Sequence, residues 1–206
     1  MNTRLLTRRR LIASTCLMSL ADCSLVSAPT PQMYQLSPAD DDPPGATVRR
    51  GSLAIDTPTA PENLDSDRIA LTRGATRFAY FADATWTDRV PVLLRTLLVE
   101  AFEATGRIAD VWTDPEGMTT GHLLQTQIRA FNARYGDAAA RPPVVDVSLD
   151  LRLVRLPGQR TVGRTLIGSQ SRAAQNEVAS VVRAFNVATA EALNRSVTWT
   201  LQVMRS

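Results

Sequence analysis

Few side chains in this chain have the chemistry of a catalyst or a metal ligand. Among its 206 residues there is one histidine, His122, and there are two cysteines, Cys16 and Cys23. Both cysteines precede Ser24, so the remainder has neither a thiol nucleophile nor a His/Cys set of metal ligands. His122 has the chemistry of a general base, but a single histidine beside a glycine is more often a surface or capping residue. The sequence therefore predicts neither thiol catalysis nor a metal centre.

Paired carboxylates are the other candidate for acid–base chemistry. Asp146 and Asp150 lie on the polar face of one predicted strand, four residues and therefore roughly 13 Å apart. This separation exceeds that of the carboxylate pair of a glycosidase. We expect these acids to form a solvated face, balanced by Arg152 and, across the sheet, by Arg164. The glycines of the segment 163–168 lack the lysine of a phosphate-binding loop. We therefore predict a protein that is not an enzyme and needs no cofactor.

Cys23 lies where a lipid could be attached. The sequence Leu20-Ala21-Asp22-Cys23 has the form of a lipobox, the pattern at which a lipoprotein signal is cut and the cysteine thiol carries diacylglycerol. Asp22 departs from this pattern, because the residue before the cysteine is normally Gly, Ala or Ser, and a carboxylate is costly to desolvate at a membrane enzyme. The alternative is ordinary cleavage after Ser19-Leu20-Ala21, which would leave a soluble periplasmic protein.

The segments around Cys23 support its export and anchoring. A basic start at 1–10 precedes a ten-residue apolar run at 11–20, which is too short to span a membrane. We assign residues 1–22 to an export signal peptide. Residues 23–47 are rich in proline and contain three consecutive acids, a composition typical of an unpacked tether. The 22 residues of 24–45 would reach roughly 70 Å when fully extended. Such a tether favours lipidation of Cys23.

The charge of the chain is concentrated in the predicted signal. All 23 basic residues are arginines, and the formal net charge is +3. Cleavage before Cys23 would remove four arginines and one acid, so the mature chain would be formally neutral. A basic surface for nucleic acid is therefore not predicted.

From Val48 onward the pattern predicts one folded domain, residues 48–206. Alternating apolar and polar residues are typical of strands with one wet face. We expect such strands near 53–55, 69–71, 78–80, 108–112, 122–131, 144–156 and 160–171.

Two stretches have helical spacing of apolar residues instead, 88–106 and 176–204. The first has Asp88 as a candidate cap, Pro91 in its first turn and Gly106 as a stop. Strands in series with two segregated helices predict an α+β fold, a mostly antiparallel sheet with two long helices packed on one face.

Short motifs follow one another in a particular order along the mature chain. They are Tyr34-Gln35-Leu36, Arg68-Ile69-Ala70, Phe78-Ala79-Tyr80-Phe81, Trp86 leading into Pro91-Val92-Leu93-Leu94, the strand 145–153, and Phe185-Asn186 with Trp199. This ordered set covers nearly all of the mature chain. It resembles the ABC-type transport auxiliary lipoprotein family, the PqiC-like proteins.

The resemblance implies a place and a function. It implies a non-catalytic lipoprotein, anchored through Cys23 at the periplasmic face of the outer membrane of a Gram-negative bacterium. Its partners would be an inner-membrane ABC transporter and an MCE-domain protein that move lipids or other hydrophobic molecules. The alternative is a soluble periplasmic binding or outer-membrane assembly protein of the same fold. A homo-oligomer is left open.

Three residues of the motifs are candidate partner contacts, Tyr34, Leu36 and Trp86. Each also has a structural interpretation. Trp86 is placed to pack where the hairpin meets the first helix, and Tyr34-x-Leu36 is placed to dock as an edge strand, either on the domain or on a partner.

Overall fold

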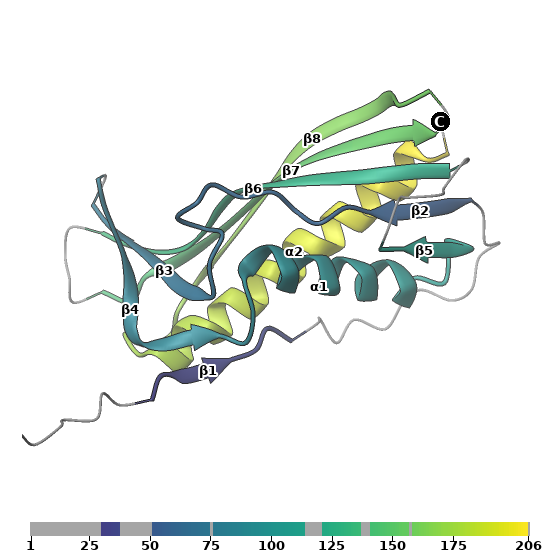
Figure 1. The fold of residues 1–206 in the computed structure, drawn as a ribbon. Coiled ribbons are helices and arrows are strands. Elements are labelled where there is room, and N and C mark those ends of the chain that lie inside the picture. The colour runs from purple at the N-terminus through teal and green to yellow at the C-terminus, as the bar shows by residue number, and fades with distance from the viewer. Residues whose placement is uncertain are drawn as a thin grey trace, which may run out of the picture.

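The computed structural model describes residues 30–37, 51–74, 76–113, 121–136, 141–156 and 158–205. Cys16, Asp22 and Cys23 lie outside these residues, as does most of the predicted tether. The described part forms eight strands and two helices (Figure 1). The strands are β1 (Gln32–Tyr34), β2 (Ser52–Ile55), β3 (Arg68–Arg73), β4 (Arg77–Trp86), β5 (Asp110–Trp112), β6 (Gly121–Tyr135), β7 (Val144–Leu156) and β8 (Arg160–Arg172), and the helices are α1 (Val90–Ala104) and α2 (Val178–Val203).

Strand β6 is the centre of one curled sheet. On one side β7 pairs antiparallel with β6, and β8 pairs antiparallel with β7 as the outermost strand. On its other side β6 is shared by two strands, because β2 pairs with its first part and β3 with its last part. Strand β5 continues the β2 branch, and β4 and then β1 continue the β3 branch (Figure 1).

The sheet is mixed, whereas the sequence predicted a mostly antiparallel one. The pairs β1–β4, β2–β5, β2–β6 and β3–β6 are parallel, and the pairs β3–β4, β6–β7 and β7–β8 are antiparallel. Alternation of apolar and polar residues shows that a strand has one buried face, but it carries no information on the direction of the neighbouring strand. The prediction of an α+β fold with two helices is confirmed at that coarser level.

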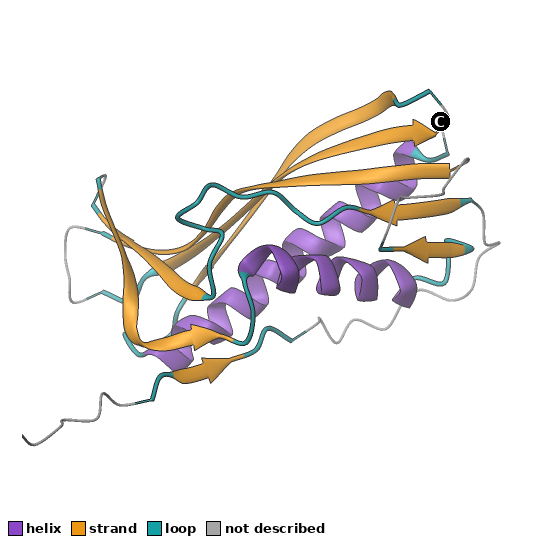
Figure 2. Ribbon diagram, in the orientation of Figure 1, coloured by secondary structure: helices purple, strands orange, loops and turns teal. Residues whose placement is uncertain are grey.

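Both helices lie on one side of the sheet (Figure 2). Helix α2 packs on β7 and β8, while α1 packs on α2 and on the strands β2 and β5. Three aromatic rings meet in the core between these layers. The ring centroids of Trp86 and Phe185 are 5.1 Å apart, and those of Phe131 and Phe185 are 4.9 Å apart. All three side chains are at most 1% exposed, so the core joins β4, β6 and α2.

The ends of α1 follow the predicted signals with one exception. Pro91 lies in the first turn, where its missing N–H is no loss, and Gly106 just beyond the helix has φ of +60°, which favours glycine. The predicted cap is wrong. Arg89 is the N-cap residue and no side chain caps the helix, while Asp88 lies one residue earlier and accepts the Arg89 N–H at 2.7 Å.

Strand β1 lies inside the segment whose composition predicts an unpacked tether. Its residues Gln32–Tyr34 pair in parallel with Ala84–Trp86 of β4, and Leu36 beyond it is 2% exposed. Residues 32–36 are therefore part of the folded domain. Three paired residues and one apolar contact are too few to produce a periodic signal, so composition conceals the strand.

Candidate functional site

The structure brings together the three residues predicted as partner contacts. Tyr34 is the register partner of Trp86 across the β1–β4 pair, and the Thr87 N–H donates to the Tyr34 carbonyl at 3.0 Å. Leu36 follows two residues later and joins the same hydrophobic core. The three side chains thus form one junction, where the first strand of the domain meets the hairpin strand that leads to α1.

This junction presents little surface. Trp86 is 1% exposed, and its ring packs edge-on against Phe131 and Phe185. Tyr34 is half-buried, and its hydroxyl donates to Gln32 Oε1 at 2.8 Å. Of the two interpretations of each residue, the structure places Trp86 in the core and Tyr34-x-Leu36 as an edge strand docked on its own domain.

Asn186 completes the junction from the side of α2. Its Oδ1 accepts the backbone N–H of Ser37 at 3.3 Å, so the chain is held on both sides of Leu36. Asn186 belongs to the sequence motif Phe185-Asn186, but the sequence alone predicts no role for it. The sequence feature that could have indicated a role is the presence of a polar residue with low helix propensity next to the fully buried Phe185 within a long helix.

His122 lies within strand β6. It is neither a capping residue nor a fully exposed surface residue. Its side chain is half-buried, and its register partners are Leu53 of β2 and Arg155 of β7. Within the described residues neither Nδ1 nor Nε2 has a hydrogen-bond partner. Burial, and then the charge of Arg155, lowers the pKa of His122. The imidazole is thus neutral at pH 7, and no nucleophile of the described part is hydrogen-bonded to it.

The two acids of β7 lie on its polar face as predicted, and they are neutralised by arginines. Asp150 accepts from Arg164 at 2.7 Å and from Arg129 at 2.9 Å. The expected partner Arg164 is therefore confirmed, whereas Arg152 donates to Thr161 instead, at 2.8 Å.

Hydrogen bonds from Arg164 and then Arg129 lower the pKa of Asp150 to about 2. The other acid, Asp146, lies 3.4 Å from Arg134. Asp150 therefore remains ionised at all ordinary pH values and is tied to two guanidinium groups, so it cannot act as a proton donor.

A groove of about 750 Å³ runs between β8 and α2, and no pattern in the sequence predicts it. Leu166 of β8 and Val187 of α2 line it and are 63% and 59% exposed. Arg195 of α2 donates to the Gly168 carbonyl of β8 at 2.6 Å, so the helix covers part of the unpaired edge of the sheet. The groove exists only in the tertiary structure, because it forms where a strand and a helix pack side by side.

Two kinds of site are absent from the described ranges. Within them, no group of three His, Cys, Asp or Glu side chains could hold a metal ion. No helix there is long and apolar enough to cross a bilayer.

Fold and site together define a class of protein: an α+β domain with a curled mixed sheet, two helices on one side of it, and an N-terminal strand held at the junction of β4 and α2. The chain belongs to the family described as the ABC-type transport auxiliary lipoprotein component, which it matches over residues 34–201. The resemblance drawn from the sequence is therefore confirmed. Membership of a lipoprotein family implies an envelope-associated location.

Known relatives share this fold at low sequence identity. The uncharacterized protein bll6063 of Bradyrhizobium diazoefficiens is 29% identical over 169 residues, which are 82% of this chain and 44% of the relative. The chain thus spans less than half the length of that relative. Protein XCC0632 of Xanthomonas campestris has a similar crystal structure, with a TM-score of 0.77 at 23% identity over 84% of this chain and 97% of that one. An uncharacterized protein gives a TM-score of 0.64 at 15% identity, over 83% and 99%.

Proposed function

We propose that this protein is a non-catalytic, lipid-anchored auxiliary component of an envelope transport system. In this proposal Cys23 carries the lipid at the periplasmic face of the outer membrane. The partners are an inner-membrane ABC transporter and an MCE-domain protein, and the cargo is a lipid or another hydrophobic molecule. The observation that carries the proposal is the family match over residues 34–201.

Two further observations support a binding role. The residues with the best acid–base chemistry do not form a catalytic pair, because Asp150 is paired with two arginines and His122 has no hydrogen-bond partner among the described residues. The sequence also predicts an export signal, followed by Cys23 and a short connection to the domain.

Lipidation is tested by labelling cells with a radioactive fatty acid. We expect label in the parent protein and none in Cys23→Ser. Unlabelled parent protein whose N-terminus is a free Asp22 would overturn the anchored function, and it would support the alternative of a soluble periplasmic binding or assembly protein cut after Ala21.

The transport role is tested in the native bacterium. After mild detergent extraction, we expect the protein to co-purify with the MCE-domain protein and the permease of one transporter. The matched control is Cys23→Ser, which should remain exported but lose the complex because it is no longer held at the membrane. Loss of the gene without any change in the distribution of envelope lipids would count against a lipid cargo.

A further inference from the structure

We propose that strand β1 decides which end of the domain faces the anchoring membrane. By docking on β4, β1 makes the chain leave the domain beside the start of α2, and that end then lies against the phospholipid surface. This inference rests on the proposed lipidation of Cys23.

The domain has two ends at which an N-terminal tether could be attached. Figure 1 shows β1 beside the first turns of α2, and β2 at the end where α2 finishes. A Cβ added to Gly51, the residue before β2, would lie 3.6 Å from Met204 Cε, just past the end of α2. Helix α2 has 26 residues and is therefore about 39 Å long. Attachment through β1 and attachment through Gly51 thus leave the domain from opposite ends.

Docking of β1 also shortens the tether. With β1 in place, only residues 24–31 connect Cys23 to the domain, and eight residues reach at most about 28 Å. Without β1, residues 24–50 form the connection, and they reach about 90 Å. A tether of about 28 Å is shorter than α2, so the far end of an upright domain cannot be the end that touches the membrane. The longer tether imposes no such limit.

The contacts of β1 are sufficient to hold it. Its three residues are in register with β4, and the Thr87 N–H reaches the Tyr34 carbonyl at 3.0 Å. Leu36 is 2% exposed, and the Ser37 N–H bonds Asn186 at 3.3 Å. Burial of the Leu36 side chain removes apolar surface from water, and the hydrogen bonds on both sides of it add to this stabilisation. Met33 points outward at 74% exposure, on the strand that would lie closest to the lipid headgroups.

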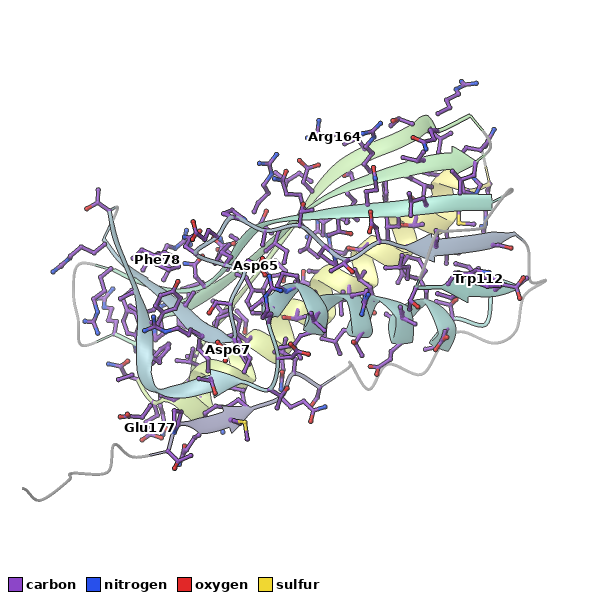
Figure 3. All side chains as sticks on the ribbon, viewed as in Figure 1. Asp65, Asp67, Phe78, Trp112, Arg164 and Glu177 are labelled. Atoms are coloured by element: carbon purple, nitrogen blue, oxygen red, sulfur yellow. The ribbon has the colours of Figure 1, made fainter. Side chains whose placement is uncertain are left out.

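Two exposed residues report the orientation. Glu177 is exposed beside the start of α2, and Trp112, which is 50% exposed, lies on β5. Figure 3 shows Trp112 and Glu177, the residue before α2, at opposite ends of the molecule. Since no cysteine follows Cys23, and lipidation blocks that thiol, Glu177→Cys and Trp112→Cys each provide a single labelling site.

The experiment measures energy transfer from a donor at position 177 or 112 to acceptor headgroups in phospholipid vesicles. All variants carry Asp22→Gly, which restores a small residue before Cys23, and the mass of the N-terminal peptide verifies lipidation. We expect transfer from position 177 to exceed transfer from position 112 by about twofold or more, given the relative lengths of tether and domain. Equal transfer, or stronger transfer from position 112, would overturn the inference.

Two matched insertions test whether β1 is the cause. About 20 flexible Gly/Ser residues are inserted either between Ser27 and Ala28 or between Asp41 and Asp42. If β1 is docked, only the first insertion lengthens the tether, so it alone should abolish the contrast between the two positions. Equal effects of both insertions would mean that the domain hangs from Gly51, contrary to the proposal.

Leu36→Asp should release β1 and abolish the contrast between positions 177 and 112, because the longer tether does not fix the orientation, while Met33→Ser should leave the contrast unchanged. Circular dichroism and thermal unfolding verify that the variant domain is folded. Retention of the contrast in a folded Leu36→Asp variant would count against the role of β1. If the parent with Asp22 is never lipidated in cells but the Asp22→Gly protein shows the contrast, the proposed anchoring fails while the geometry of β1 stands.

Discussion

At the scale of single residues, the two side chains with acid–base chemistry are held in opposite charge states. His122 is neutral because burial and the nearby Arg155 disfavour the imidazolium ion. Asp150 is ionised because Arg164 and Arg129 stabilise the carboxylate. Each shift links the stability of the fold to pH, with an effect that can be separated from that of other groups.

His122 predicts a loss of stability in mild acid. Its pKa in the folded state is lowered from its ordinary value of 6.5, so the unfolded chain binds the proton first as the pH falls. The contribution is complete above the unfolded pKa and is lost as the pH falls through the folded pKa. We expect the denaturant midpoint of the parent domain to fall between about pH 7.5 and 5, and to fall less in His122→Gln. Because the chain has no second histidine, identical slopes in the two proteins would contradict the prediction.

Asp150 predicts a second loss of stability in stronger acid. Its pKa is lowered from 3.8 to about 2, so its contribution is present above the unfolded value and is lost as the pH falls toward the folded one. We expect Asp150→Asn to lower the free energy of unfolding at pH 7 by about 1 kcal/mol, a modest value for ion pairs of partly exposed arginines. Asp146→Asn is the matched control, because its nearest guanidinium nitrogen lies at 3.4 Å and its loss should cost less. Chemical denaturation compares the two variants, and equal losses would refute the role of the Asp150 cluster.

At the scale of elements, the close approach of α2 to β8 depends on a glycine. A Cβ added to Gly163 would lie 3.0 Å from side-chain atoms of both Trp199 and Val203, which is tighter than most real Cβ contacts. In the same strand a Cβ at Gly168 would meet nothing within 4 Å. One face of α2 can therefore lie directly on the backbone of β8 at one point along the strand.

This contrast predicts different outcomes for two alanine substitutions in β8. Gly163→Ala should destabilise the domain by about 1 to 3 kcal/mol, because α2 must shift to admit the methyl group. Gly168→Ala should be close to neutral, since its methyl group enters open space. Thermal unfolding of both variants checks the pair, and the idea fails if Gly168→Ala is the more damaging of the two.

At the scale of the whole molecule, the proposed export signal and lipid anchor together with the domain would hold a folded unit near a membrane. Asp22 is the weak step in this arrangement, because the enzyme that cuts a lipoprotein signal must accept a carboxylate next to the cysteine. The family match supports the proposed lipidation in spite of it, and under that proposal the pairing of β1 with β4 would limit how far the domain can move from the anchor.

Asp22→Gly should therefore speed the processing of the precursor. We expect the lipidated mature form to accumulate faster in a pulse-chase experiment with labelled fatty acid, while the final amount changes less. Cys23→Ser provides the baseline without lipid. An unchanged rate would show that the carboxylate does not limit cleavage.

Features that depend on residues close together in the chain could be predicted from the sequence, and features that depend on residues far apart in the chain could not. Helix α1 was predicted nearly to its ends because Pro91, Gly106 and the apolar stripe are local signals. The long strand β7 was predicted from alternation alone. Asp88 was assigned as a cap in error, because several residues before a helix can cap it and only the backbone geometry chooses among them. Strand directions and the docking of β1 depend on partners distant in the chain, and no local pattern encodes them.

By itself the sequence determined the family, the absence of a thiol in the domain and an α+β pattern with two helices, and it predicts an export signal and a cysteine placed for lipidation. These properties follow from composition and local periodicity, which act over a few residues. Only the tertiary structure decided that Trp86 belongs to the core, that the sheet is mixed, and that residues 32–36 belong to the domain rather than to the tether. Each of these depends on contacts between residues about 50 to 150 positions apart, such as Tyr34 with Trp86 and Ser37 with Asn186. Such contacts form only when the core closes.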